Sequence, residues 1–91
     1  MENENNEMQV IILQNKDIKL KKINDVKVIR IKDEKYNLLI MKDYWPVIGE
    51  INGSVYIEAL ENHSFENIKA FYTLSHNIFR LIIVEENIKE Q

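Results

Sequence analysis

Apolar residues recur mainly at every second position of this chain, which is the spacing of a β-strand with one buried face. SVYIEA is the clearest case, because Val55, Ile57 and Ala59 alternate with Tyr56 and Glu58. Seven further segments are strand candidates: MQVIILQ, DIKLKKI, VKVIRIKD, NLLIMK, PVIGEI, KAFYTL and IFRLIIVE. The pattern predicts one all-β domain over residues 8–86, a small antiparallel β-sandwich or flattened barrel of about 8–10 strands.

In three of these candidates the sequence also indicates where the strand lies in the sheet or how it is interrupted. The apolar positions of VKVIRIKD change phase after Val28, which indicates a β-bulge or a change of face. NLLIMK is a continuous apolar run, which is typical of a strand covered on both sides. In DIKLKKI, Ile18 and Leu20 alternate with lysines, so we expect the lysines on the outer face of an edge strand.

Trp45, Pro46 and both glycines of the chain lie within nine positions. Asn52-Gly53 separates two strand candidates, and Asn-Gly is typical of the type I′ hairpin turn. The sequence therefore predicts that PVIGEI and SVYIEA pair as a hairpin. Pro46 is expected at a strand start or edge, and Gly49 at a bulge or a close approach of another group.

The segments outside these strands are interpreted as irregular. ENHSFENIKAF, with Ser64 as a candidate N-cap, is interpreted as a loop with at most one helical turn. The acidic residues 1–7 and the polar residues 87–91 are too poor in apolar side chains to order themselves, so we expect flexible tails.

Composition excludes several classes of function. The chain has 91 residues, a net charge of −3 and no cysteine, which argues against nucleic-acid binding, disulfides and thiolate metal sites. No apolar run approaches the roughly 20 residues of a membrane span, and no leader pattern is present. An intracellular, cytoplasmic protein without membrane insertion is the simplest interpretation.

The sequence holds no recognisable catalytic motif. His63 and His76 lie outside any known motif, and no serine lies in a nucleophile elbow. Two glycines are too few for a phosphate-binding loop. We therefore expect no catalytic residues, no cofactor, no metal and no enzymatic activity.

Aromatic residues are more numerous than a small core requires: Tyr36, Tyr44, Trp45, Tyr56, Phe71 and Tyr72. Such residues can stack on single-stranded nucleic acid, but basic residues are not interleaved with them. A protein–protein patch is the better interpretation.

The order of these features resembles the N-terminal β-sandwich domain of the epsilon subunit of F-type ATP synthases. The resemblance covers about residues 8 to 86 and uses MQVIILQ, INDVKVIRI, KYNLLIMKDYWPVIGEI, NGSVYIEA and KAFYTLSHNIFRLIIVEE. These segments match, in order, the family's first strand, its valine-rich strand, its Gly-Glu-x-Gly and Pro-Gly-His-x-Pro region, its Gly-x-Val-x-Ile hairpin and its Ser-Gly-Gly strand.

Several family features are altered here. Tyr44 replaces the corner histidine, and Tyr36, Asn37 and Leu39 replace the Gly-Glu-x-Gly loop that contacts the rotor ring in the family. Contact with a rotor ring is therefore in doubt. The Ser-Gly-Gly turn becomes Ser75-His76-Asn77, where Asn tolerates positive φ. In the family this domain is usually followed by a regulatory helical hairpin, with a nucleotide site in some members, and we expect both to be absent here.

The resemblance implies an accessory, non-catalytic subunit of a rotary ATPase. Such a subunit binds the gamma subunit of the central stalk, rotates with it, and shares its complex with alpha and beta catalytic chains. The corner Tyr44, Trp45, Val47 and Ile48 corresponds to the gamma-facing part, although Trp45 is equally compatible with a place over the core. The altered loop and the missing helices favour a specialised ATP-hydrolysing motor, such as one linked to gliding motility, at the inner face of the membrane.

One alternative from another class stays open. The chain would then be a free-standing small β-barrel that binds a peptide or single-stranded nucleic acid. A positively charged face would favour this alternative, whereas the net charge is negative.

Overall fold

The computed structural model describes residues 7–14 and 19–86, which form an all-β fold. The strands are β1 (Met8–Gln14), β2 (Lys19–Val26), β3 (Val28–Asp33), β4 (Asn37–Met41), β5 (Val47–Glu58), β6 (His63–Ser75) and β7 (Ile78–Glu86). The predicted tails lie outside the described residues, apart from Glu7, and so does Ile18.

The strands form one sheet in the order β2-β1-β7-β6-β5-β3-β4. Neighbouring strands are antiparallel except β1 and β7, which are parallel, so the sheet is mixed rather than purely antiparallel. The described residues contain seven strands, fewer than expected, because PVIGEI and SVYIEA, predicted as two strands, belong to the one long strand β5.

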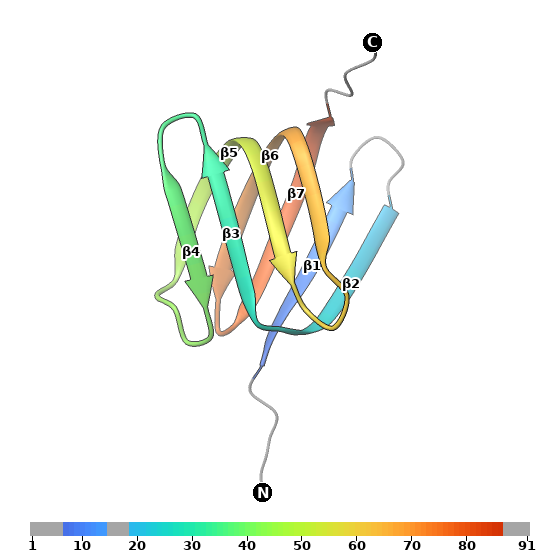
Figure 1. Cartoon of the computed structure of the whole chain (residues 1–91), viewed down its shortest axis with the longest axis vertical. Coiled ribbons are helices and arrows are strands. Elements are labelled where there is room, and N and C mark those ends of the chain that lie inside the picture. The colour runs from blue at the N-terminus through green and yellow to red at the C-terminus, as the bar shows by residue number, and fades with distance from the viewer. Residues whose placement is uncertain (1–6, 15–18, 87–91) are drawn as a thin grey trace, which may run out of the picture.

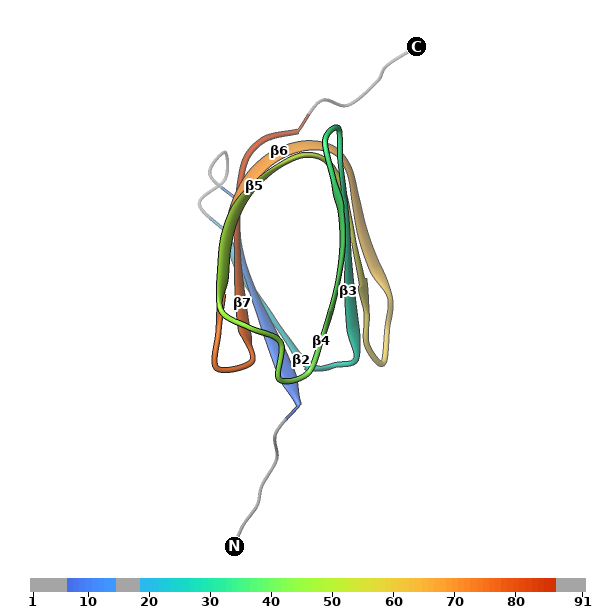
Figure 2. The same ribbon diagram turned by 90° about the vertical axis from the view of Figure 1, so that its left-hand side faces the viewer.

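The sheet folds over on itself into two layers, because β5 and β6 curve through both (Figure 1, Figure 2). The β3–β4 layer contains these two strands with the second half of β5 and the first half of β6. The β1–β7 layer contains β1, β2 and β7 with the remaining halves of β5 and β6. This is the flattened, sandwich-like architecture that the sequence predicts.

Bulges mark the place where β5 and β6 bend. The pairing register between these strands shifts between Gly53 and Val55, and that between β6 and β7 shifts between Lys69 and Ala70. Asn67, which lies beside this corner, has a φ of 57°. Bulges bend a strand and increase its twist, so these positions turn one continuous sheet into two layers.

The predicted Asn52-Gly53 hairpin is wrong. Both residues lie inside β5, and neither has positive φ, which a type I′ turn requires. A Cβ atom on Gly53 would clash with the carbonyl oxygen of Lys32. Gly53 is therefore needed because the neighbouring backbone passes so close at the bend, not because the chain reverses there.

The loop interpretation of ENHSFENIKAF is also wrong. Residues from His63 onward form the first part of β6 and pair with β5, where Ser64 lies opposite Tyr56 and Phe65 opposite Val55. The bulge and the positive φ of Asn67 interrupt the period of two, so the segment does not display a strand pattern in the sequence.

The interior between the layers is wholly apolar among the described residues. No polar or charged residue is buried there. The largest fully buried side chains are Phe79, Met8, Ile12, Ile29, Ile31, Ile40, Ile51, Ile57, Ile68, Leu81, Val10 and Val26. Burial of apolar surface from both layers is the main stabilising contribution to this fold.

The phase change in VKVIRIKD coincides with a change of layer. Val26 pairs with Met8 of β1, whereas Val28, two residues later, pairs with Met41 of β4 and Glu58 of β5. Lys27 is the single residue between β2 and β3, and its N–H donates to the carbonyl of Glu58. The phase change predicted as a β-bulge or a change of face is thus a change of layer, and Val26 and Ile29 on either side of it are both buried in the core.

The two edge strands differ from expectation. β2 is an edge strand, as predicted, but Leu20 lies opposite Leu13 on the outer face, whereas Lys21 lies opposite the buried Ile12. β4 is the other edge, and Leu39 and Met41 are 46% and 51% exposed. The expectation that NLLIMK is covered on both sides is therefore wrong within this chain.

The predicted turn before the last strand is confirmed. His76 and Asn77 connect β6 to β7 with φ values of 50° and 63°, the two positive values of a type I′ turn.

We expect Gly53→Ala to lower the free energy of unfolding by roughly 2–3 kcal/mol, because the new Cβ meets backbone that cannot move without disturbing the β3–β5 ladder. Urea denaturation measures this difference. Ser54→Ala, at the next position, is the control and should change stability by less than about 0.5 kcal/mol. Equal stability of the two variants would contradict this account of the bend.

Candidate protein interface

The corner predicted as an interface lies in the loop between β4 and β5 and in the first two residues of β5. Trp45 is 80% exposed and Ile48 is 79% exposed, whereas Tyr44 and Val47 pack partly against the core. Trp45 therefore does not cap the core. Pro46 lies directly before β5 begins at Val47, as expected of a strand start.

Hydrogen bonds hold this corner against the turn between β6 and β7. The N–H of Asp43 donates to Oδ1 of Asn77 at 2.6 Å, and Nδ2 of Asn77 donates to Oδ1 of Asp43 at 3.1 Å. The N–H of Tyr44 donates to the carbonyl of Met41, and that of Gln9 donates to the carbonyl of Asn77. The loop thus presents Trp45 from a fixed base, which lowers the entropic cost of binding.

A row of apolar side chains crosses the outer face of the β1–β7 layer. Phe71 lies opposite Ile82, Ile82 opposite Leu13, and Leu13 opposite Leu20. Side chains on directly opposite residues share a face, so the four form a continuous row over β6, β7, β1 and β2. Phe71 is 50% exposed, and Ile82 and Leu20 are exposed as well.

Ile48 connects this row to the corner. Its neighbour on the same face of β5, Glu50, lies opposite Phe71, so Ile48 is diagonal to Phe71. Arg80 and Lys22 flank the row on the same face. An apolar centre with a charged rim is the usual anatomy of a protein interface. We call the corner Tyr44–Ile48 together with the row of Phe71, Ile82, Leu13 and Leu20 the apolar surface.

Sequence reasoning missed this row. Its signal is present in IFRLIIVE, where alternation after Arg80 continues with apolar residues on both faces. Such a run predicts a strand that is covered on both faces. In the single chain only the inner face of β7 is covered, and its outer face is exposed.

The three residues of the altered family loop have different environments. Asn37 and Leu39 lie in the edge strand β4 with their side chains exposed. Tyr36 instead turns inward, and its hydroxyl donates to the carbonyl of Glu50 at 2.7 Å and lies 3.1 Å from the hydroxyl of Tyr72. Tyr36 therefore ties the β3–β4 turn to the other layer.

Asp33–Lys35 forms a solvated turn between β3 and β4. The carboxylate of Asp33 accepts hydrogen bonds from the N–H groups of Lys35 and Asn52. The N–H of Glu34 donates to the carbonyl of Asn52. The carboxylate thus fixes the turn over the bend in β5 and is not free for acid–base chemistry.

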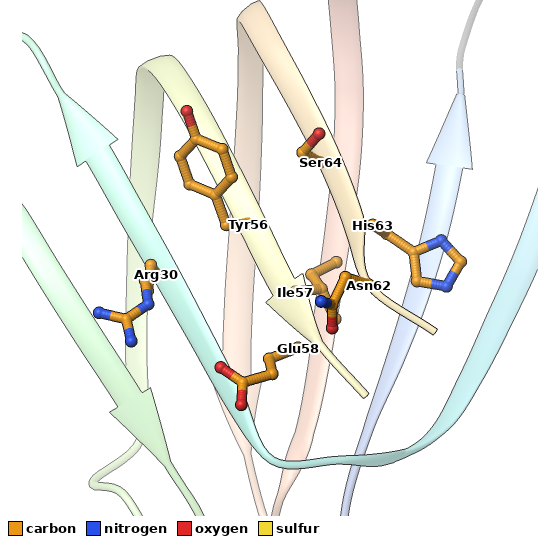
Figure 3. A pocket seen from close by; sticks show the side chains of 7 residues that line it. All are labelled: Arg30, Tyr56, Ile57, Glu58, Asn62, His63 and Ser64. Carbon is orange, nitrogen blue, oxygen red and sulfur yellow. The ribbon is translucent and has the colours of Figure 1, made fainter. Parts of the chain in front are cut away.

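A polar hollow lies elsewhere on the surface and brings no reactive groups together. It has a volume of about 310 Å³ on the β3–β4 layer, and its lining includes Arg30, Tyr56, Glu58 and His63. Figure 3 shows His63 pointing to the opposite side from Arg30 and Glu58. Tyr56 donates a long hydrogen bond of 3.4 Å to Glu66. No set of groups converges on one reacting atom there.

Two further properties of the described residues bear on function. Within residues 7–14 and 19–86, no three His, Asp or Glu residues cluster closely enough to hold a metal ion. The same residues include no helix of the length and apolarity that crossing a bilayer requires.

Comparison with known proteins identifies a similar fold. The chain is similar to a chain in the cryo-EM structure of the Euglena gracilis mitochondrial ATP synthase, OSCP/F1/c-ring in rotational state 1, with a TM-score of 0.73 and 14% identity. The match covers 91% of this chain and 54% of that chain, so this sequence spans about half of its length. No protein-family model and no curated protein matches the sequence.

The chain therefore has a fold that is found in a chain of an ATP synthase complex. At 14% identity this likeness shows the fold alone. Any functional conclusion must rest on the surface that this chain presents.

Desolvation by burial and, after it, the hydrogen bond with Tyr72 raise the pKa of Tyr36 well above its ordinary value of 10.0. The folded chain thus keeps the Tyr36 proton at a pH where the unfolded chain has lost it. This contribution to stability is complete below pH 10 and is lost as the pH rises above it.

We therefore expect the free energy of unfolding to fall as the pH rises from about 9.5 to 11.5, and to fall less steeply in Tyr36→Phe. Urea denaturation at a series of pH values measures both slopes. Comparison of slopes separates the titration from the hydrogen bonds that the variant loses at every pH. Identical slopes would show that Tyr36 is not the group responsible.

Proposed function

We propose that this chain is a non-catalytic, epsilon-like subunit of the central stalk of a rotary F-type or F-type-like ATPase. It binds the gamma-like subunit and rotates with it, in a complex with alpha and beta catalytic chains. The exposed Trp45-Ile48 corner, held on a fold that an ATP synthase chain shares, is the observation that carries this proposal.

The chemistry of the corner supports a protein partner. Tryptophan and tyrosine are enriched among the residues that contribute most to binding energy. A tryptophan that is 80% exposed gains little from the folded chain alone but gains fully from burial against a partner. Two reciprocal hydrogen bonds to Asn77 keep the loop in place before a partner arrives.

The apolar row on the β1–β7 layer extends this contact. A long helical partner that lies across β6, β7 and β1 would cover Phe71 and Ile82 while reaching Ile48 at the corner. Arg80 on the same face would pair with acidic residues of such a helix. This geometry suits an elongated coiled-coil chain better than a short peptide.

We further propose that the complex is a specialised motor driven by ATP hydrolysis, of the kind that gliding motility would use. This proposal rests on the sequence resemblance and on the replacement of an acidic ring-contact loop by Asn37 and Leu39, which lie in an ordinary edge strand. The complex would place the chain in the cytoplasm, at the inner face of the membrane.

A native pull-down from the source cells, with mass spectrometry of the partners, tests the proposal. We expect the tagged protein to recover alpha-, beta- and gamma-like ATPase chains. The double variant Trp45→Ala/Ile48→Asp should recover at least about tenfold less of them, because it removes a buried anchor and places a charge in the interface.

Leu60→Asp is the matched control, because Leu60 is 97% exposed in the turn between β5 and β6, outside the apolar surface. It should recover the ATPase chains as the unaltered protein does. Recovery of RNA or of an unrelated peptide partner, without ATPase chains, would overturn the proposal and favour the free-standing barrel.

A further inference from the structure

The two edges of the sheet are protected very differently. β2 carries Lys19, Lys21 and Lys22 along its exposed side, and charged residues on an edge discourage pairing with another strand. β4 has the sequence NLLIM, with no charge, proline or bulge. An edge of this kind is open to a further strand.

Residues 47–52 of β5 pair with β6 but with no strand on their other side. Backbone groups on that side are nevertheless hydrogen-bonded within the chain. Tyr36 donates to the carbonyl of Glu50, and the β3–β4 turn bonds both the N–H and the carbonyl of Asn52. Among the described residues, no equivalent cap lies on Asn37 or Leu39 of β4.

The hydrogen-bond phase of β4 shows which of its groups face outward. The N–H of Asp33 donates to the carbonyl of Tyr36, so these residues form a hydrogen-bonded pair at the start of the β3–β4 ladder. Such pairs alternate in an antiparallel ladder, so Leu38 and Ile40 bond to β3. The N–H and carbonyl groups of Asn37 and Leu39 therefore point away from the sheet.

From this edge we infer that β4 pairs with β4 of a second copy of this chain, antiparallel and centred on Leu39. In this register Leu39 lies opposite Leu39, Leu38 opposite Ile40, and Asn37 opposite Met41 of the partner. All five residues are paired, and the outward-facing N–H and carbonyl groups of Asn37 and Leu39 meet outward-facing groups. The carbonyl of Met41 already accepts from the N–H of Tyr44, and it receives Asn37 of the second copy as a second donor.

The same register matches the faces of the two strands. Residues of equal parity lie opposite each other, so Leu38 and Ile40 stay on the inner side of both chains and Leu39 and Met41 on the outer side. No like charges are opposed at any of the five positions, and like charges directly opposite would be destabilising. The strand is thus complementary to itself, which favours a second copy over another occupant.

The contact is small, because only five residues per chain pair. Stable interfaces generally bury above about 1,000 Å², so a weak, concentration-dependent dimer is expected. The inference goes beyond the proposed stalk role and does not depend on it, because Trp45, Ile48 and Phe71 of the apolar surface take no part in the β4 pairing.

Sedimentation velocity of the whole purified chain, from micromolar concentrations to about 1 mM, tests the inference. We expect a rise in mean mass toward twice that of one chain. Leu39→Lys should raise the dissociation constant at least about tenfold, because two lysines then face each other across the twofold axis. Leu20→Lys, the same change on the other edge strand, should alter it by less than about twofold.

Amide hydrogen exchange of the unaltered chain provides a test that does not depend on a variant folding. The amides of Asn37 and Leu39 should become more protected as the concentration rises, whereas that of Leu38, already bonded to β3, should not change. A chain that stays monomeric to about 1 mM would overturn the inference. Equal sensitivity to Leu20→Lys and Leu39→Lys, or unchanged Asn37 and Leu39 amides, would overturn it as well.

Discussion

The close passage of β3 past Gly53 is the constraint on which this structure depends. The carbonyl of Lys32 occupies the space that any Cβ at position 53 would need. This approach lets β5 bend from one layer into the other while its pairing with β3 continues to Asp33. Because β6 follows β5 through the same bend, one sheet supplies both walls of a wholly apolar core.

The use of one sheet for both walls of the core also leaves apolar surface outside the core. A chain with seven described strands folded in two layers buries one face of each layer, and the other face meets solvent. Here that outer face carries Phe71 and Ile82, and the loop beside it carries Trp45. Exposed aromatic and aliphatic side chains on a rigid base indicate a contact with another protein, and the polar hollow at Arg30 offers no comparable chemistry.

The sequence predicted the fold class well because period-two alternation survives in most strands. The prediction failed at Asn52-Gly53, a pair that is typical of a hairpin turn. Here Gly53 is required for another reason, because the backbone of Lys32, which is distant in sequence, leaves no room for a Cβ atom. The bulge near Asn67 hid the start of β6 in the same way. The corner residues were identified from the family resemblance, whereas the Phe71–Leu20 row depends on register across four strands, which a single sequence does not contain.

The central claim is that the corner and the neighbouring face bind a long stalk subunit. Site-specific photo-crosslinking in the source cells tests it most directly, with a photoreactive residue in place of Ile48 and, in a parallel strain, of Leu60. The account predicts a crosslink from position 48 to a gamma-like ATPase chain and none from position 60. A crosslink from position 60 but not from 48, or crosslinks from position 48 only to proteins unrelated to an ATPase, would contradict it.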